Sequence, residues 1–523
     1  MTRLLLASFV FSLFAGCGDD DGPTPDPDIG LDMAPETAPV IQGLLLSESP
    51  ASVLAYELVF DTDVPALATV SIAIVGDAPR TLFAETEATM AHAIPVLELR
   101  AETAYELSVE VVSPGGTRGT PALENFTTGA LPEDFPPVDV EVLDGAAMAP
   151  GLTLFGVRRW TPSQDTGWGY LLALDAEGQV VWYVPTNRPP GPVAVRPNGN
   201  IVMGYANTSM TELTTLGEEL WDRRAADIGT DTFHHENQLL PDGTILALSS
   251  ELRSISGYPD DQTFDVIGDT VVVVNADATE VMTEYSVFDI LDPLRQRPGF
   301  NATFWNNVYS EVSESTKDWT HGNAVVVDPT DGNWVLSLRH QDWVAKMDAS
   351  NGDLIWRFGF EGDFTMSGDG VFPFHTHAPE FDDAGRMLIY DNGNNREGLA
   401  EGEDPFTRAV EYELDRETMT ATQLWEYRGT APYYAPFVGD ADRLANGNVL
   451  ITDGGLIVEC PGTTIENACT PGNANNQKWA RIVEVTREAE PREIFRITLR
   501  DDATPTGYTV YRAERLETLY GTP

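Results

Sequence analysis

Six of the seven histidines lie between residues 234 and 377, and they are the residues best suited to chemistry in this chain. Imidazole can take a proton, attack an electrophile or bind a metal near neutral pH. The histidines fall in three segments, Phe233–Asn237 (FHHEN), Asp318–Asn323 (DWTHGN) with His340 nearby, and Phe374–Ala378 (FHTHA). This clustering predicts one site to which all three segments contribute.

Two kinds of site use clustered imidazoles, and the neighbouring residues favour one of them. A metal centre needs three or four ligands and often a carboxylate. Glu236 adjoins His235, but alternation along a strand turns the two side chains to opposite faces. Arg339 instead supplies the cation that an anion site needs. We therefore favour a site that handles an anionic group, with metal-binding histidines and purely structural histidines as the alternatives.

The spacing between the histidines and the turns that follow them indicates where they lie. His235 and His377 each precede a turn glycine by eight residues, and His321 precedes one by eleven, which we interpret as a turn three residues longer. The turn glycines are Gly243, Gly385 and Gly332, and neighbouring repeats carry Gly191 and Gly439 at the corresponding place. Equivalent positions in a ring of repeats lie around its axis. We therefore expect the three histidines to converge.

The elements that must position these residues are repeated hairpins. From about residue 150 onward each unit carries one aromatic residue after apolar neighbours, and the last three intervals are 71, 69 and 70 residues. These residues are Trp182, Trp221, Tyr285, Trp356, Trp425 and Phe495, and turns with Gly199, Gly243, Gly332, Gly385 and Gly447 recur between them. Six all-β units predict a six-bladed β-propeller over residues 150–523. The strand near 152–155 is expected to close the ring with the C-terminal unit.

The residues before the propeller have a different pattern. Over 38–130, short alternating strands are separated by turn residues, and the segment that ends at Tyr105 resembles a strand entry of fibronectin type III domains, where a tyrosine closes a corner. We expect a small fibronectin-like or Ig-like β-sandwich there, so the predicted fold class is all-β. Residues 1–17 are typical of a lipoprotein signal peptide with a lipid on Cys17, and 18–37 of a disordered tether.

Export would place the protein in the periplasm or at the cell surface, anchored to the membrane by that lipid alone. Oxidising conditions there favour a disulfide between Cys460 and Cys469. The 82 acidic and 31 basic residues give a formal charge of −51, which argues against nucleic acid as a partner because a polyanion would be repelled. An anionic substrate would need a local cationic pocket.

Several motifs occur in the order found in a known family. They are Asp318–Asn323 (DWTHGN), Ser337–Gln341 (SLRHQ), Ile355–Gly359 (IWRFG) and His377 running on to Ile389–Gly393 (IYDNG). Together they resemble the bacterial arylsulfate sulfotransferases, which need no nucleotide sulfate donor. The resemblance covers about 150–523 and implies a β-sandwich followed by a six-bladed propeller. It also implies ping-pong transfer of a sulfuryl group from an aryl sulfate donor to a phenolic acceptor.

The same resemblance implies the roles of the site residues. His377 would be the nucleophile that forms a sulfohistidine, and His235, His321 and Arg339 would complete the site without cofactor or metal. Thr376 departs from the family, which has glutamine there. Four further expectations concern neighbouring residues: His375 is a rival nucleophile on the same strand face, His234 is a rival to His235, His340 points away from Arg339, and Asp391–Gly393 is a turn without chemistry.

Two functions from other classes stay open. A surface-anchored propeller could use the histidine ring only to bind a ligand or a metal. A quinone-dependent dehydrogenase propeller is less favoured, because its usual ring has eight blades and the repeats found here number six. The sequence leaves open whether the protein forms a homodimer.

Overall fold

The computed structural model describes residues 37–161, 169–205, 207–399, 405–430, 433–457, 478–504 and 506–521. Within them helix is limited to five 3₁₀ turns, η1 (Ala225–Ile228), η2 (Pro259–Asp261), η3 (Val287–Asp289), η4 (Phe304–Asn307) and η5 (Arg339–Gln341). None of these could cross a membrane. Cys17, Cys460 and Cys469 lie outside the described residues, so the lipid anchor and the disulfide stay predictions.

The N-terminal region is built around one very long strand. Its strands are β1 (Ile41–Ser49), β2 (Ser52–Ile74), β3 (Arg80–Ala84), β4 (Thr89–Val96), β5 (Ala104–Val112) and β6 (Ala122–Thr127). The first half of β2 pairs with β1 and β4, and its second half pairs with β3 and β5. The hydroxyl of Tyr105 accepts a hydrogen bond from the Arg100 backbone N–H at 2.8 Å, which is the contact expected of a tyrosine corner. Because β2 joins all six strands, the sandwich of two separate sheets stays a prediction.

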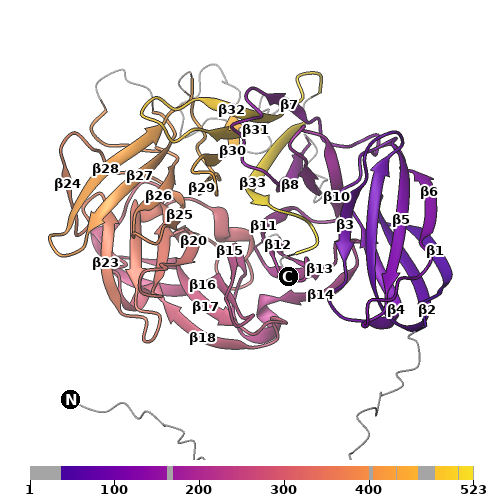
Figure 1. Cartoon of the computed structure of the whole chain (residues 1–523). Coiled ribbons are helices and arrows are strands. Elements are labelled where there is room, and N and C mark those ends of the chain that lie inside the picture. The colour runs from indigo at the N-terminus through magenta and orange to yellow at the C-terminus, as the bar shows by residue number, and fades with distance from the viewer. Residues whose placement is uncertain are drawn as a thin grey trace, which may run out of the picture.

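Six sheets, antiparallel except for one parallel strand in the third and one in the fifth, follow one another along the chain and form a ring (Figure 1). The first three sheets contain β8 (Leu152–Trp160), β9 (Gly169–Leu174), β10 (Val180–Thr186) and β33 (Gly507–Leu516); β11 (Pro190–Val195), β12 (Ile201–Tyr205), β13 (Ser209–Leu213) and β14 (Glu219–Arg224); and β15 (His234–Leu239), β16 (Ile245–Tyr258), β17 (Gln262–Val274), β18 (Val281–Ser286) and β19 (Thr316–Asp318). The fourth contains β20 (Gly322–Val327), β21 (Trp334–Leu338), β22 (Trp343–Met347) and β23 (Leu354–Gly359).

The last two sheets each gain one additional outer strand. The fifth contains β24 (Thr365–Ser367), β25 (His377–Phe381), β26 (Met387–Asp391), β27 (Arg408–Asp415) and β28 (Thr420–Tyr427). The sixth contains β29 (Asp440–Arg443), β30 (Val449–Ile457), β31 (Lys478–Val485), β32 (Glu493–Leu499) and β7 (Asp139–Val142). Six sheets confirm the predicted all-β propeller and exclude the eight-bladed alternative.

The aromatic repeat marks the same strand in every sheet. The six residues lie one each in β10, β14, β18, β23, β28 and β32. Apart from Tyr285, which is partly buried, all of them are buried and pack between sheets, and Trp182 and Phe495 are completely covered. The turn glycines lie between the first two strands of five sheets, where a positive φ such as the 85° of Gly199 closes the hairpin.

Both ends of the propeller segment close the ring. β33 pairs with β8, as the sequence predicted, and forms the innermost strand of the first sheet. β7 pairs with β32 and forms the outer edge of the last sheet, a pairing that the sequence did not indicate. The innermost strands then contact one another in the order β33, β11, β15, β20, β25, β29 and back to β33. These six strands are the inner wall, and they carry the histidine segments.

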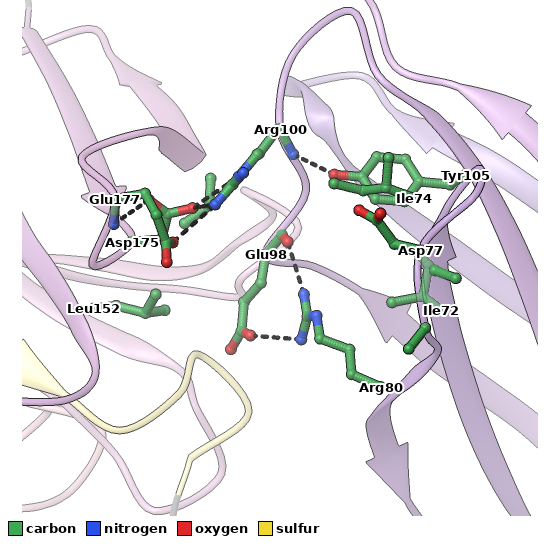
Figure 2. A pocket seen from close by; sticks show the side chains of 13 residues that line it. Ile72, Ile74, Asp77, Arg80, Glu98, Arg100, Tyr105, Leu152, Asp175 and Glu177 are labelled. Atoms are coloured by element: carbon green, nitrogen blue, oxygen red, sulfur yellow. Dashed lines mark hydrogen bonds and ion pairs between the residues drawn. The ribbon is translucent and has the colours of Figure 1, made fainter.

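A cavity of about 440 Å³ lies between the N-terminal region and the first sheet, away from the histidines (Figure 2). Apart from Asp77, its charged lining residues are paired with one another. Arg100 donates to Asp175 and Glu177, and Arg80 donates to Glu98. The ion pairs of Arg100 connect the two regions, whereas the Arg80–Glu98 pair lies within the N-terminal region.

Candidate active site

The inner wall brings the predicted site residues together. The ring centroids of His235 and His321 are 5.2 Å apart, and those of His321 and His340 are 4.6 Å apart. His377 is only 3% exposed, and the positive charge of Arg339 acts on it. His235, His321 and Arg339 are partly exposed. The site is therefore a mostly buried cluster that solvent reaches on one side, and we call these four residues the histidine cluster.

The proton on His377 is positioned by a side chain that sequence reasoning missed. Its Nδ1 lies 2.5 Å from Asn392 Oδ1. The amide nitrogen of Asn392 donates to the carbonyls of Ala435 at 2.7 Å and Val438 at 2.9 Å, which fixes the amide orientation. Oδ1 must then accept a hydrogen from His377 Nδ1, and this leaves the lone pair on Nε2. Asp391 ends β26 and Asn392 follows it directly, so the expected turn does not form at these residues, and Asn392 contacts His377.

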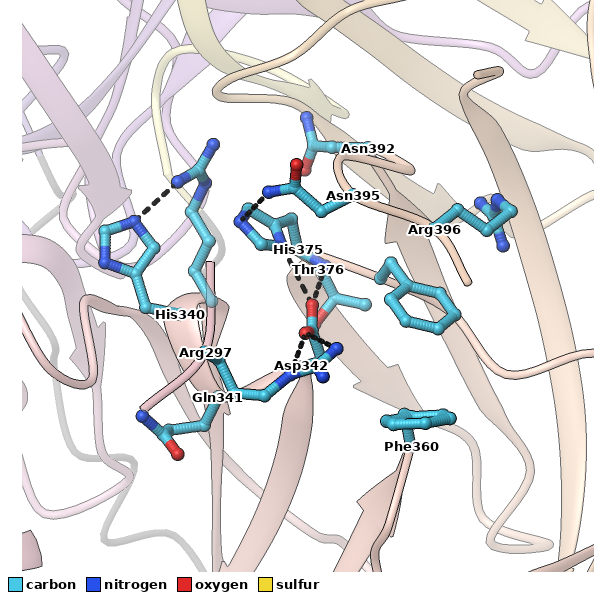
Figure 3. Close-up of polar contacts among 12 residues, drawn as sticks. Arg297, His340, Gln341, Asp342, Phe360, His375, Thr376, Asn392, Asn395 and Arg396 are labelled. Atoms are coloured by element: carbon cyan, nitrogen blue, oxygen red, sulfur yellow. Dashed lines mark hydrogen bonds and ion pairs between the residues drawn. The ribbon is translucent and has the colours of Figure 1, made fainter. Parts of the chain in front are cut away.

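His375 lies in a different environment, and it is not on the same strand face as His377. It precedes β25 with a left-handed φ of 52°, and its backbone N–H and Nδ1 both donate to Asp342 Oδ1, at 3.0 and 2.8 Å. Asn395 Nδ2 lies 3.4 Å from His375 Nε2 (Figure 3). Arg297 binds the second oxygen of Asp342 at 2.9 Å. His375 is thus part of a buried ion-pair network beside the cluster.

His321 is paired with a carboxylate. Its Nδ1 donates to Asp318 Oδ2 at 2.6 Å, and the indole of Trp305 donates to Asp318 Oδ1 at 3.1 Å. Burial raises the pKa of Asp318 to about 6. Burial, followed by the charge of Arg339, holds the pKa of His321 well below its ordinary value. A neutral imidazole whose Nδ1–H donates a hydrogen bond to a carboxylate has Nε2 available as a base. When Nε2 takes up a proton, the carboxylate stabilises the imidazolium that forms.

Arg339 is held by its neighbour, contrary to expectation. His340 points toward it: Arg339 Nη1 donates to His340 Nε2 at 2.8 Å, and Arg339 Nη2 donates to the Pro436 carbonyl at 2.9 Å. His340 Nδ1 donates to the Asp318 carbonyl at 2.9 Å. Because a 3₁₀ turn rather than a strand carries Arg339 and His340, the alternation used in the sequence prediction does not apply. These contacts use two of the five guanidinium N–H groups, and three can reach a ligand.

His234 and His235 are also distinguishable. His234 is buried, its Nε2 donates to the Ser249 carbonyl at 2.9 Å, and its Nδ1 lies 2.8 Å from His235 Nδ1. The hydrogen between the two rings is therefore donated by His235, whose Nε2 keeps the lone pair. Burial, followed by the charge of His234, lowers the pKa of His235 well below its ordinary value. His234 positions His235 and faces away from the cluster.

The predicted register of His321 is wrong. The turn after β20 comprises residues 328–333, between the paired Val327 and Trp334, and the turn after β25 comprises 382–386. The turn after β20 is therefore one residue longer than the turn after β25, not three residues longer. Counted back from the last paired residue, Asn323 matches His377, and His321 lies two residues earlier. A left-handed φ of 47° at His321 still places its ring beside His235.

One group among the described residues is compact enough to suggest a metal, namely Asp318, His321 and His340, whose potential ligand atoms lie within 4.8 Å of one another. Hydrogen bonds engage both oxygens of Asp318 and both nitrogens of His340. A guanidinium also donates directly into the group. A metal ion would have to displace these contacts and sit beside a fixed positive charge, so the arrangement suits an anion better.

Acidic residues in the same ring are kept apart from the cluster. Arg512 Nη1 binds Glu236 Oε2 at 2.7 Å, while the adjacent Tyr511 hydroxyl donates to the His235 carbonyl at 2.9 Å. The ring of His235 lies 5.2 Å from that of His321, whereas Glu236 binds Arg512; the two side chains thus point in different directions, and because His235 has a left-handed φ of 59°, strand alternation is not the reason. Burial raises the pKa of Asp440 to about 7 and that of Glu514 to about 8. We call Glu236, Asp440, Glu514 and Arg512 the acidic cluster; β33 contributes two of its members, which no local motif indicated.

The fold and the site together define the class of protein: a six-sheet β-propeller with imidazoles and a guanidinium gathered in its interior. Residues 144–512 match the model of the arylsulfotransferase (ASST) family, and this chain belongs to that family. It is 25% identical over 172 residues to the arylsulfate sulfotransferase AssT of Escherichia coli O6:H1, a match that covers 27% of this chain and 28% of that enzyme.

Solved structures give weaker likenesses. A protein of unknown function from Bacteroides caccae is similar with a TM-score of 0.39 and 16% identity, covering 70% of this chain and all (100%) of that one. Hydrazine synthase of Kuenenia stuttgartiensis has a TM-score of 0.30 and 9% identity, covering 58% of this chain and 65% of that one.

Proposed function

We propose that this protein transfers a sulfuryl group from an aryl sulfate to a phenol through a sulfohistidine on His377. The observation that carries the proposal is the hydrogen bond of that imidazole: Asn392 accepts the proton of Nδ1, which leaves Nε2 as a nucleophile on which the positive charge of Arg339 acts. Membership of the arylsulfotransferase family supports the same activity.

The first half-reaction forms one bond and breaks one. His377 Nε2 attacks the sulfur of the aryl sulfate, the N–S bond forms, and the S–O bond to the aryl group breaks. The aryl group leaves as a phenolate. The Nδ1 proton stays on His377 and remains hydrogen-bonded to Asn392. As in phosphoryl transfer, catalysis rests on positioning and on stabilising the charge of the non-bridging oxygens. The remaining N–H groups of Arg339 suit that role.

The second half-reaction uses the His321–Asp318 pair. His321 Nε2 takes the proton of the acceptor phenol, and Asp318 stabilises the imidazolium. The phenolate oxygen attacks sulfur, the O–S bond forms, and the N–S bond to His377 breaks. The proton then passes to the released donor phenolate, which completes a transfer from aryl sulfate and phenol to phenol and aryl sulfate.

The low pKa values suit this cycle. Burial, followed by neighbouring cationic groups, lowers the pKa values of His235, His321 and His377 and so favours their neutral forms. A neutral imidazole is required for attack by His377 and for proton uptake by His321. An arriving sulfate ester brings a negative charge that favours protonation of His235, which could then donate to a non-bridging oxygen.

Trapping the intermediate tests the mechanism. With 4-nitrophenyl sulfate alone we expect one equivalent of nitrophenol and a mass increase of one sulfuryl group on the peptide that contains His377; adding a phenol should discharge the adduct. If fragmentation of that peptide placed the sulfuryl group on His375 instead of His377, the assignment of the nucleophile would be overturned. Absence of any adduct together with stoichiometric bound metal would favour the binding propeller instead.

We further propose that the protein is exported and held at a membrane by a lipid on Cys17. The support is the apolar run that ends at Cys17 and the acidic segment that follows it. Metabolic labelling with a fatty acid should mark the wild type and leave Cys17→Ser unlabelled. Equal labelling of both would contradict the anchor.

A further inference from the structure

A second group of cations lies beside the histidine cluster. Trp160, the last residue of β8, has the guanidinium of Arg158 3.7 Å from its ring centroid and the ammonium of Lys478 also 3.7 Å away. Lys478 lies 5.2 Å from the ring centroid of Phe437 as well. Two cations and two aromatic rings thus form one continuous surface, which we call the cationic wall.

The cationic wall has no acidic partner within the parts of the chain that the structure describes. Neither Arg158 nor Lys478 forms an ion pair or a side-chain hydrogen bond there, and Arg158 Nε is buried without a partner. Lys478 is only 5% exposed. Most other arginines are paired, as expected for a chain with 82 acidic residues. Two adjacent buried cations are costly unless an anion joins them.

The cationic wall reaches the histidine cluster by two routes. Phe437 lies between Pro436, whose carbonyl accepts from Arg339, and Val438, whose carbonyl accepts from Asn392. Trp160 donates to the hydroxyl of Thr509 at 2.9 Å, and Thr509 precedes Tyr511, which binds the His235 carbonyl, by two residues of β33. A bulge between Val510 and Ala513 separates Thr509 from Tyr511, so this route connects the two sites through the chain of β33 and not through a shared strand face.

Building on the proposed function, we propose that Arg158, Trp160, Phe437 and Lys478 form a subsite for a second negatively charged group on the aryl substrate. The preferred acceptors are then phenols that carry a carboxylate. Arg158 and Lys478 bind the carboxylate, and the rings of Trp160 and Phe437 contact the aryl group. The second charge compensates the two cations while the phenolic oxygen reaches the histidine cluster.

Isosteric acceptors test the subsite. With 4-nitrophenyl sulfate as donor, kcat/KM for 4-hydroxyphenylacetate should exceed that for 4-hydroxyphenylacetamide by at least about 10-fold, because only the former is charged. Lys478→Met or Arg158→Met should remove most of that preference and leave the amide within about 2-fold. Arg223→Met is the matched control, since the guanidinium of Arg223 also lies near a tryptophan ring, that of Trp221. Both residues belong to β14, the outermost strand of its sheet, and not to the inner wall. Equal kcat/KM for both acceptors in the wild type would overturn the subsite and leave the sulfotransferase standing.

A binding measurement keeps the subsite testable without turnover. Calorimetric titration of His377→Asn with the same two phenols should give at least about 10-fold tighter binding of the carboxylate, lost in the His377→Asn/Lys478→Met double variant. If the wild type transfers no sulfuryl group but this preference persists, the proposed function fails and the subsite stands. Equal binding of acid and amide would overturn the subsite, and melting temperatures of the variants would separate this outcome from unfolding.

Discussion

The histidine cluster and the acidic cluster share the inner wall, yet they are opposite in charge. The acidic cluster holds Glu236, Asp440 and Glu514 around one arginine, whereas the histidine cluster holds neutral imidazoles around Arg339. Adjacent residues supply both: His235 and Glu236 come from one strand, and Tyr511 and Arg512 from another. The left-handed backbone at His235 and the bulge in β33 that contains Tyr511 and Arg512 turn neighbouring side chains toward different clusters. A chain of charge −51 can in this way keep a histidine-rich site apart from its acidic groups.

Substitution of the proposed nucleophile should give the largest difference in activity between variants of the two clusters. His377→Asn is expected to lower kcat/KM by at least about 10³-fold, because the proposed N–S bond forms on His377 Nε2 and asparagine offers no nucleophilic ring nitrogen in its place. Nitrophenol release in the presence of a phenol measures the loss. Glu514→Gln, a change in the acidic cluster, and His375→Asn should each keep at least about a tenth of the activity. Full activity of His377→Asn would refute the assignment.

Loss of the guanidinium should have the next largest effect. Arg339→Met is expected to lower kcat/KM by about 10²–10³-fold, because the transition-state charge on the sulfuryl oxygens loses its cation. Arg339→Lys should recover part of the activity, since a point charge lacks the planar fork. Steady-state kinetics of both variants provide the test. Retention of wild-type kcat/KM in Arg339→Met would move the anion site elsewhere.

Asn392 should matter less than either of these residues, and through position alone. Asn392→Ala is expected to lower kcat about 10–100-fold because the Nδ1 proton of His377 loses its acceptor. The hydrogen bond to Asn392 raises the pKa of His377, so its removal should shift the acid limb of the kcat/KM profile to lower pH. Asn395→Ala, which alters the equivalent neighbour of His375, is the control. An unshifted profile would show that Asn392 acts only in packing.

The two clusters should affect stability with opposite dependence on pH. In the acidic cluster the folded pKa values of Asp440 and Glu514 lie above their unfolded values, so their stabilisation is complete at low pH and is lost as pH rises through about 7 to 8. The buried histidines have lowered pKa values, so their stabilisation is present above about pH 6.5 and is lost as pH falls. Near neutral pH, a change in pH therefore shifts the free energy of unfolding in opposite directions through the two clusters.

This opposition gives the smallest expected effect. The variant Asp440→Asn/Glu514→Gln should melt about 2 °C or more above the wild type at pH 8, and that advantage should shrink as pH falls toward 5, where the native carboxyls are protonated. Calorimetric melting temperatures at several pH values measure it. An advantage that grows on acidification would contradict the raised pKa values.

Much of the architecture follows from local pattern. The regular aromatic residues and the glycine turns each report on one hairpin, since strand alternation and turn geometry depend on a few consecutive residues. They therefore sufficed to predict six sheets and to place His235 and His377 at equivalent positions of the inner wall, whereas Arg339 was assigned to the site by the family resemblance. The prediction failed where backbone left the strand: the 3₁₀ turn at Arg339 and the left-handed backbone at His321 and His375 each reorient a side chain that alternation would have placed otherwise.

One sheet has a glycine, Gly439, at the position that corresponds to His377, and the packing explains why no larger side chain stands there. At Gly439 an added Cβ would lie 2.2 Å from a ring carbon of Tyr390, so the neighbouring sheet already fills the place that His377 occupies in its own. No local pattern contains that information.

By itself, the sequence determined the repeats, the fold class and the identity of the chemical groups, because these depend on residue type and short-range spacing. Only the tertiary structure decided which proton His377 carries, which carboxylate supports His321, and which strands close the ring. Asn392 depends on the carbonyls of Ala435 and Val438, and β33 reaches β8 from the opposite end of the propeller segment. Hydrogen bonds between distant segments form only once the chain has closed on itself, so their partners are set by the fold as a whole.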